Sequence, residues 1–227
     1  MPLATLIDAI LPAACCLCGT VGAGRLCTAC IALLPDNPLC CARCGLPTAM
    51  PVAECGECLA ETPAFEATHA GWRYQPPLDS LLPRLKFRQG LAVAEALGRV
   101  LALQLQSRGW PPPEWLLPLP LHPGRLRERG YNQAQELARV LARELGWPMR
   151  HDLLRRVRAT APQAGLDAKA RRRNVRDAFA ASGAVSGRRV YLCDDVMTTG
   201  ATLRTAARAL LDAGASEVRV IVAARRP

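Results

Sequence analysis

One stretch near the C-terminus, residues 190–203, constrains the fold more than any other part of the chain. It begins with four apolar residues, which is typical of a buried parallel strand, and Asp194 and Asp195 follow directly. The small and hydroxyl residues Thr198, Thr199, Gly200, Ala201 and Thr202 come next, and an apolar-periodic helix follows them. A strand, a tight loop and a helix N-terminus together form an anion site, because free backbone N–H groups point outward and the helix dipole favours negative charge. Gly200 lets the backbone approach an anion closely, since it has no Cβ.

The two carboxylates need their own explanation, because they would repel a bare phosphate. They suit a ligand that also carries a divalent cation or vicinal hydroxyls, and a sugar phosphate with Mg²⁺ meets both conditions. In the alternative interpretation, Asp194 and Asp195 merely end a strand and Thr198 caps the next helix. The complete run resembles the phosphoribosyl pyrophosphate (PRPP) motif of type I phosphoribosyltransferases, with Cys193 where an aliphatic residue is usual.

Four C-x-x-C pairs occupy the N-terminal quarter of the chain. They are Cys15/Cys18, Cys27/Cys30, Cys41/Cys44 and Cys55/Cys58. Two such pairs hold one tetrahedral Zn²⁺, so the four pairs predict one or two structural zinc ions. The spacings favour two successive sites, although a crossed pairing would satisfy the same count, and disulfides are the alternative chemistry. With four cysteine ligands no coordination position stays open, which argues against catalysis at zinc.

A small module of this kind needs the metal for its stability. About 60 residues bury only roughly 60% of their surface and are marginal alone, whereas structural zinc supplies roughly 10–16 kcal/mol in small peptides. The apolar segment 3–11 contains Asp8, lacks a positive flank and is too short to span a bilayer. We therefore expect no membrane span and a cytoplasmic protein, and clustered cysteines in a reducing compartment indicate metal.

The rest of the chain alternates strands and helices. Strands are expected over 69–74, 116–121, 188–194 and 217–223, and helices over 78–87, 92–107, 132–145 and 201–213. The C-terminal β-loop-α-β pattern is typical of a parallel sheet with ligands at the carboxyl ends of its strands. We therefore predict an α/β fold, a parallel sheet flanked by helices, over residues 63–227, and a zinc ribbon module over residues 1–62.

Arginine dominates the charge of the chain. The net charge is +10, and such a balance attracts anions, nucleic acid among them. The loop predicted after the 116–121 strand contains several arginines and a glycine, which suits a pyrophosphate. The run Arg171, Arg172 and Arg173 fits either a solvated surface or a DNA contact, and only 4% of residues are aromatic, which leaves few platforms for stacking single-stranded bases.

Several motifs together resemble the ComF (ComFC) family over essentially the whole chain. They are the cysteine pairs, residues 118–123, 127–133, 162–166 and 171–175, and the run from Asp194 to Thr202. The family joins a double zinc ribbon to a type I phosphoribosyltransferase domain, and it is associated with cytoplasmic handling of incoming single-stranded DNA in natural transformation, with other DNA-uptake proteins as further partners.

The resemblance also implies roles for individual residues. Asp194 and Asp195 would form the catalytic pair that binds the ribose hydroxyls of PRPP, directly or through Mg²⁺, and Thr198, Thr199, Gly200, Ala201 and Thr202 would hold the 5′-phosphate. His122, Pro123, Gly124 and Arg125 would form the pyrophosphate loop, and the segment around Gln163 would close over the site.

Three functions fit this pattern. The first is a PRPP-binding ComF protein of DNA uptake that acts as a transferase toward an acceptor the sequence does not name. The second is a nucleobase-salvage phosphoribosyltransferase, and the third is a non-catalytic DNA-binding module that kept a phosphate pocket. No residue stands out as a general base. The interpretation as an enzyme therefore rests on the PRPP motif alone.

Overall fold

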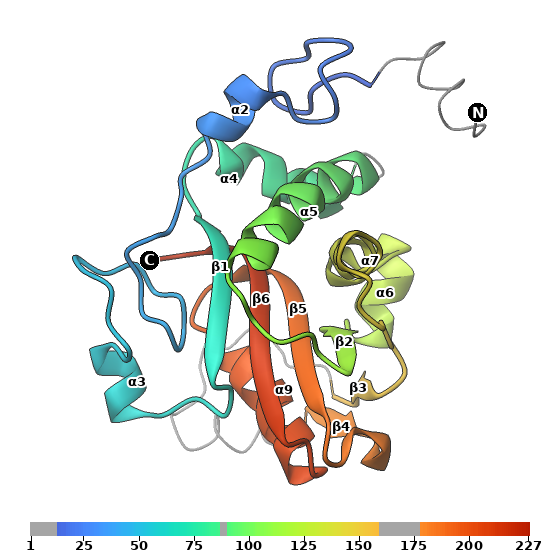
Figure 1. The fold of residues 1–227 in the computed structure, drawn as a ribbon. Coiled ribbons are helices and arrows are strands. Elements are labelled where there is room, and N and C mark those ends of the chain that lie inside the picture. The colour runs from blue at the N-terminus through green and yellow to red at the C-terminus, as the bar shows by residue number, and fades with distance from the viewer. Residues whose placement is uncertain (1–12, 87–89, 159–177) are drawn as a thin grey trace, which may run out of the picture.

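The computed structural model describes residues 13–86, 90–158 and 178–227. Its centre is a four-stranded parallel sheet in the order β1-β6-β5-β2 (Figure 1). The strands are β1 (Ala67–Arg73), β2 (Trp115–Pro118), β5 (Arg189–Met197) and β6 (Glu217–Arg225). The predicted strands at 69–74, 188–194 and 217–223 are confirmed as β1, β5 and β6. The expected loop near Gln163 and the run 171–173 lie outside the described residues.

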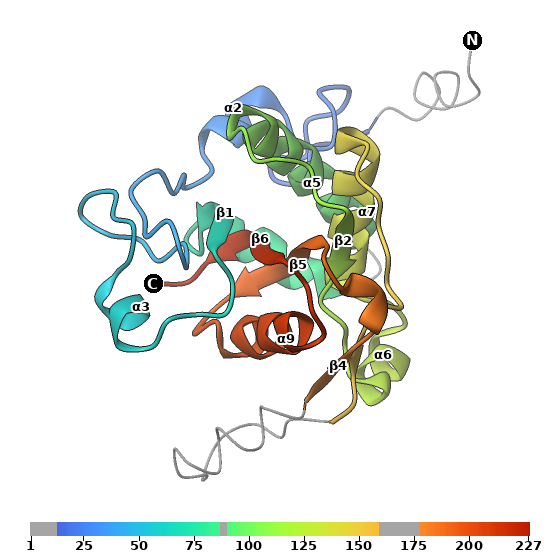
Figure 2. The same ribbon diagram turned by 60° about the horizontal axis from the view of Figure 1, so that its bottom comes forward.

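The sheet lies between two layers of helices. Helices α5 (Gly90–Ser107) and α7 (Gln133–Leu145) cover one face, and α9 (Ala201–Asp212) covers the other (Figure 2). Burial on both faces explains the apolar runs of the central strands β5 and β6. The predicted α/β architecture is therefore confirmed, as are the helices expected over 92–107, 132–145 and 201–213.

The cysteine-rich N-terminal part packs against this domain at two places. It contains two short helices, α2 (Thr28–Ala32) and α3 (Gly56–Ala60). Its first half shares an apolar core with α5, and its second half shares one with α9 and the other face of the sheet. It also covers the outer edge of β1, where Arg73 N donates to Pro35 O at 2.8 Å and Thr68 N to Ala42 O at 3.1 Å. The edge strand is thereby protected from pairing with another chain. The domain boundary at 62/63 stays a prediction.

The segment after β2 differs from the expected loop. Residues Pro123–Arg129 form helix α6, in which proline occupies the first turn and the Nδ1 atom of His122 accepts a hydrogen bond from Gly124 N at 3.2 Å. Gly130, with a φ of 78°, ends the helix. The strand β2 also ends at Pro118 rather than residue 121, in a stretch where Pro118 and Pro120 lack N–H donors.

Two further differences concern short elements. The helix expected over 78–87 is split into α4 (Leu78–Leu81) and the 3₁₀ helix η1 (Leu82–Lys86), which contains Pro83. A small antiparallel pair, β3 (Leu154–Arg156) with β4 (Phe179–Ala181), was not predicted from the sequence, because three residues show no periodicity. The 3₁₀ helix η2 (Gly183–Val185) follows β4. Over the described ranges, no helix combines the length and apolar composition needed to cross a membrane.

Candidate functional site: two cysteine clusters and a cavity at the carboxyl edge of the sheet

The eight paired cysteines form two separate clusters. Cys15, Cys18, Cys27 and Cys30 make up the first cluster, and Cys41, Cys44, Cys55 and Cys58 make up the second. Within each cluster the Sγ atoms all lie within 4.8 Å of one another. All eleven cysteines of the chain are described, and each is a free thiol. The structure therefore brings the pairs together in succession, as the spacing favoured, and not crossed.

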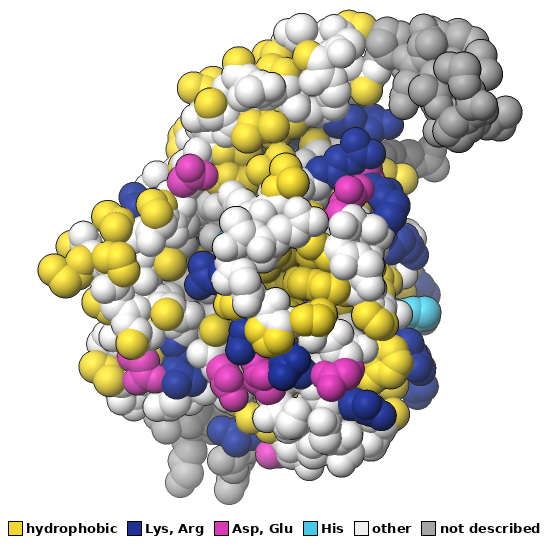
Figure 3. Space-filling model, viewed as in Figure 1, with side chains coloured by type: hydrophobic (Ala, Val, Ile, Leu, Met, Phe, Trp, Pro, Cys, Tyr) yellow, Lys and Arg dark blue, Asp and Glu magenta, His cyan; other side chains and the backbone are white. Residues whose placement is uncertain are grey.

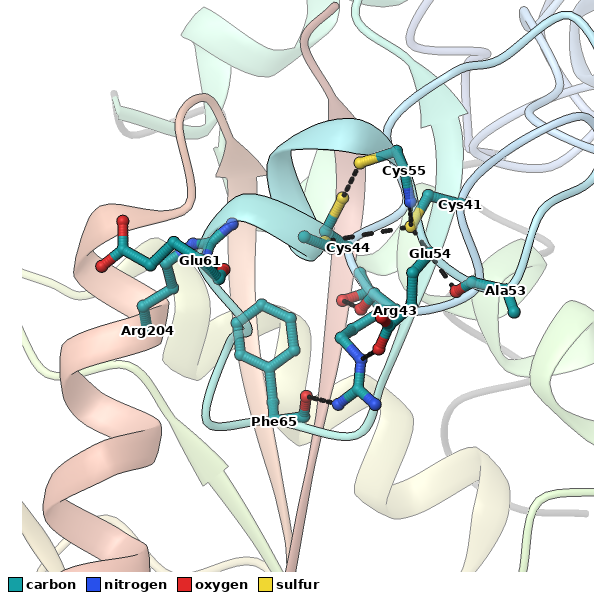
Figure 4. A network of polar contacts seen from close by, with 11 residues as sticks. Cys41, Arg43, Cys44, Ala53, Glu54, Cys55, Glu61, Phe65 and Arg204 are labelled. Atoms are coloured by element: carbon teal, nitrogen blue, oxygen red, sulfur yellow. Dashed lines mark hydrogen bonds and ion pairs between the residues drawn. The ribbon is translucent and has the colours of Figure 1, made fainter.

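The geometry of both clusters fits structural zinc. A tetrahedron with Zn–S bonds of about 2.3 Å has S–S edges of about 3.8 Å. Cys18 and Cys27 lie 3.8 Å apart, Cys44 and Cys55 3.6 Å, and Cys41 and Cys58 4.0 Å. Backbone N–H groups also point at sulfur, from Cys27 to Cys15 at 3.4 Å and from Cys55 to Cys41 at 3.2 Å (Figure 4 shows the second cluster). These donors stabilise thiolates, so the cysteines could hold one zinc ion in each cluster.

A cavity of about 380 Å³ lies at the carboxyl ends of the parallel strands. Its described lining includes two carboxylates, two threonine hydroxyls, four guanidinium groups, two amides and a tyrosine: Asp194, Asp195, Thr198, Thr202, Arg125, Arg129, Arg156, Arg226, Asn132, Gln133 and Tyr74. A larger hollow of about 780 Å³ lies between α5 and the segment that carries the first cysteine cluster, which we call the first ribbon; the segment that carries the second cluster is the second ribbon. The described lining of this hollow holds one carboxylate, Glu95, which is already paired with Arg143. We assign the functional site to the smaller cavity, which lies where α/β sheets bind ligands.

Asp194 and Asp195 follow the buried part of β5 and stand half-buried in the cavity wall. The Asp194 Oδ1 atom accepts a hydrogen bond from Asp195 N, and Asp195 Oδ1 accepts one from Val196 N, each at 2.9 Å. Burial, together with the charge of Asp195, raises the pKa of Asp194 well above its usual range, while Arg156 opposes the shift. Two adjacent carboxylates that repel each other favour a divalent cation between themselves and the ligand, and oxygen donors of this kind suit Mg²⁺.

The loop between β5 and α9 has the form that an anion site requires. Gly200 is the N-cap of α9 with a φ of 74°, and it offers no side chain to cap the helix. Thr198 and Thr199 are exposed, and Thr198 and Thr202 line the cavity. The alternative in which Thr198 caps the helix is therefore wrong, because the cap position belongs to Gly200. We call residues 198–202 the phosphate loop.

The arginine segment contributes to the cavity differently from the expectation. Of His122, Pro123, Gly124 and Arg125, only Arg125 is among the described lining residues; His122 instead caps α6. Arg129, one helical turn later on the same face of α6, reaches the cavity with Arg125. The expectation of a loop over these residues is thus corrected, because the segment is helical and presents one side to the cavity, whereas the role of the four residues toward a pyrophosphate stays a prediction.

Several lining residues were missed from the sequence. Arg156 comes from the short hairpin, where its guanidinium lies 5.6 Å from the Phe179 ring centroid. Its pKa is lowered by burial and by the charge of Arg125, whereas Asp194 raises it. Asn132 donates to Leu119 O at 2.9 Å and caps α7, so it ties the end of β2 to that helix. Tyr74 and Arg226 follow the ends of β1 and β6, and no local sequence signal marks them.

The comparisons with known proteins agree with both parts of the molecule. Residues 6–59 match the double zinc ribbon domain, and residues 128–227 match the phosphoribosyl transferase domain. The chain is 36% identical to "DNA utilization protein YhgH" of Salmonella typhi over 199 residues, which cover 86% of this chain and 88% of the relative.

Two relatives are named for competence. Competence protein F of Haemophilus influenzae is 36% identical over 86% of this chain and 88% of its own length. Competence protein ComFC of Bacillus subtilis is 30% identical over 77% of this chain and 72% of its own length. With two zinc-type cysteine clusters, a cavity at the carboxyl edge of a parallel sheet and these relatives, the chain belongs to the ComF family, which joins a double zinc ribbon to a phosphoribosyl transferase domain.

Proposed function

We propose that the protein binds PRPP with Mg²⁺ in the cavity at the carboxyl edge of the sheet and transfers its phosphoribosyl group during the use of DNA taken up by the cell. One observation carries this proposal: two carboxylates, the phosphate loop, two arginines of α6 and one arginine of β3 converge on a single cavity. PRPP carries two ribose hydroxyls, a 5′-phosphate and a pyrophosphate. Each of the three kinds of protein group in the cavity therefore has one part of PRPP to bind.

The residues divide the ligand among them. The phosphate loop holds the 5′-phosphate at the N-terminus of α9. Asp194 and Asp195 hold the ribose hydroxyls and Mg²⁺, and Arg125, Arg129 and Arg156 neutralise the pyrophosphate, for which guanidinium groups are the preferred bidentate donors. In the reaction, the bond between C1 of the ribose and the pyrophosphate oxygen breaks, and the acceptor forms a new bond to C1. The arginines stabilise the negative charge that develops on the leaving pyrophosphate.

The two ends of the cavity differ in character, which bears on the acceptor. Arg125 and Arg129 lie at the β2 end of the sheet, whereas Tyr74, Leu82 and Pro83 lie at the β1 end. The guanidinium of Arg226 lies 6.0 Å from the centroid of the Tyr74 ring. An aromatic ring with apolar neighbours suits a planar acceptor, and a nucleobase, free or within a single DNA strand, has this chemistry.

The names of the relatives and the charge of the chain support a role with DNA, which we propose takes place in the cytoplasm. Relatives are named for DNA utilization and competence, and the net charge of +10 favours a polyanionic partner. On the face seen in Figure 3, basic and acidic side chains lie side by side. Ion pairs such as Arg189 with Glu217, at 2.8 Å, neutralise part of the positive charge of the chain. A DNA strand would therefore use the arginines around the cavity.

The test is PRPP binding by isothermal titration calorimetry with and without Mg²⁺. The double variant Asp194→Asn/Asp195→Asn should lose the Mg²⁺ dependence and weaken binding by about tenfold or more, because two charge-assisted contacts are removed. Asp212→Asn removes one carboxylate charge at an exposed position at the far end of α9 and should bind PRPP as the wild type does. Equal binding by the double variant and the wild type would refute the assignment.

Pyrophosphate release distinguishes the acceptors. Release with free nucleobases alone would make the protein a salvage transferase, and release with single-stranded DNA would place the reaction on DNA. Binding of PRPP without release in either mixture would leave a binding protein, the third function considered above.

A further inference from the structure

The buried side chain of Arg225 connects the second cysteine cluster to the phosphate loop. Arg225 ends β6 and is only 3% exposed. Its Nε donates to Cys44 O at 3.1 Å, and its Nη1 donates to Met197 O at 3.4 Å and also to the carbonyls of Thr198 and Arg226. Among the described residues no carboxylate pairs with it, so this buried charge depends entirely on backbone carbonyl groups for its hydrogen bonds.

Both ends of this connection belong to functional parts of the molecule. Cys44 contributes a sulfur atom to the second cluster, and Thr198 is the first residue of the phosphate loop. Met197 and Arg225 are partners in the parallel register of β5 and β6. The guanidinium group therefore holds the peptide of a zinc-type ligand on one side and the entry to the phosphate loop on the other.

A second arginine makes an independent connection between the same two parts. Arg204 lies in the first turn of α9, and its backbone N–H donates to Gly200 O at 2.9 Å. Its Nη1 donates to Glu61 O at 2.5 Å, just beyond the helix that contains Cys58 (Figure 4). Both ends of the phosphate loop are thus linked to the second ribbon, the first end through Arg225 and the last end through Arg204.

The first ribbon makes a different contact with the domain. Arg84, in η1, donates to Cys16 O at 2.5 Å, and η1 packs against α5 on the opposite face of the sheet from α9. No hydrogen bond among the described residues joins the first cluster to the phosphate loop.

We propose that the second zinc ribbon positions the phosphate loop through Arg225 and Arg204, whereas the first ribbon serves the stability of the fold. The inference rests on the proposed function only in the ligand that it names. With zinc bound, the peptide of Cys44 is held in place and Arg225 has a fixed acceptor. When the second cluster is lost, the buried guanidinium loses a fixed acceptor at Cys44, and its remaining contacts to the carbonyls of Met197 and Thr198 at the start of the phosphate loop must rearrange. Arg225 and Arg204 are therefore positioning residues for ligand binding.

The experiment combines three measurements on the full chain: zinc content, hydrogen exchange of the peptide covering 197–204, and the dissociation constant for PRPP with Mg²⁺. Arg225→Met should keep both zinc ions, raise exchange in 197–204 and weaken PRPP binding by about tenfold or more, because a charged donor to several carbonyls is removed. Arg225→Lys keeps the charge with fewer donors and should fall between. Arg84→Met removes the equivalent arginine contact to the first ribbon, from η1 to Cys16 O, and should change neither exchange in 197–204 nor PRPP binding.

A second pair of variants tests the metal directly. Cys55→Ser should lower the zinc content by one ion and raise exchange in 197–204, whereas Cys27→Ser should lower the zinc content equally and leave that peptide protected. If Arg225→Met does not fold, Arg204→Met provides the same test from the other end of the loop. Wild-type exchange in 197–204 for a folded Arg225→Met or Cys55→Ser protein would overturn the inference. Failure of the wild type to bind PRPP would overturn only the proposed function, since exchange needs no ligand.

Discussion

Replacing Gly200 by alanine tests the phosphate loop at the residue whose backbone is left-handed. The φ of Gly200 is 74°, and a non-glycine L-residue pays about 1–2 kcal/mol for this conformation. A Cβ at this position would lie 3.4 Å from Met197 Sδ, an ordinary contact, so sterics add little. The whole effect should therefore come from backbone strain.

This strain must appear in one of two measurements. If the loop of Gly200→Ala keeps its shape, the free energy of unfolding falls by about 1–2 kcal/mol and PRPP affinity is unchanged. If the loop relaxes, stability is retained and PRPP must restore the strained shape, which weakens binding by about 5–30-fold. The losses of unfolding and binding free energy should therefore sum to about 1–2 kcal/mol.

Gly146→Ala is the matched control. Gly146 ends α7 with a φ of 68°, and a Cβ there would meet no atom within 4 Å, so it carries the same strain away from the cavity. It should lose stability only, and any effect of alanine on the unfolded chain is common to both variants. Denaturant unfolding and calorimetry measure the two quantities. A Gly200→Ala protein that matches the wild type in both, beside a destabilised Gly146→Ala, would refute the left-handed phosphate loop.

Three further predictions concern the metal, the packing and the pH response. Metal analysis should find about two zinc ions per chain, and chelation should lower the melting temperature, because zinc binding supplies folding free energy in small ribbons. In Gly98→Ala the new methyl group would lie 2.7 Å from Val140. The variant should lose about 1–3 kcal/mol of stability through this overpacking, less the roughly 1 kcal/mol that alanine gains over glycine in a helix. In denaturant unfolding, a Gly98→Ala/Val140→Ala double variant should lose less stability than the sum of the two single variants, and additive losses would contradict the close contact. His69 is 8% exposed, and burial and the charge of Arg108 lower its pKa from 6.5 to about 4. Its contribution to the free energy of unfolding is therefore complete above pH 6.5 and is lost as the pH falls toward 4, by about 3 kcal/mol in all. His69→Gln should flatten the pH dependence of the free energy of unfolding in that window, and an unchanged slope would show that another group causes it.

The sequence predicted those features that depend on local pattern. Periodic apolar residues indicated α5, α7 and α9, and the C-x-x-C spacing indicated the two clusters, because both signals lie within a few residues of chain. Helix α6 was missed, since Leu126 is the only large apolar side chain in Pro123–Arg129 and gives no periodicity, although Pro123 and Gly130 mark its ends.

The composition of the cavity could not be predicted in the same way. Arg156 is 38 residues from Asp194 in the chain, and Tyr74 is farther still. They meet only because the parallel strands end at one edge of the sheet and β3, from a separate small sheet, brings Arg156 to the same cavity. The predicted strand 217–223 stopped short of Arg225, and the contact of Arg225 with Cys44 depends on how the ribbon packs beside β1.

The strand order has a consequence for the way the protein is made. β6 comes last in chain order, yet it lies between β1 and β5 and pairs with both. During synthesis, β1 therefore emerges long before its neighbour in the sheet exists. The cysteine-rich segment precedes β1 in the chain, and in the folded protein it contacts the outer edge of that strand. A metal-loaded ribbon can thus cover the outer edge of that strand on the ribosome, so that only the opposite edge stays open until β6 is translated and pairs with it; zinc supply at the moment of translation therefore bears on how much protein reaches its native state.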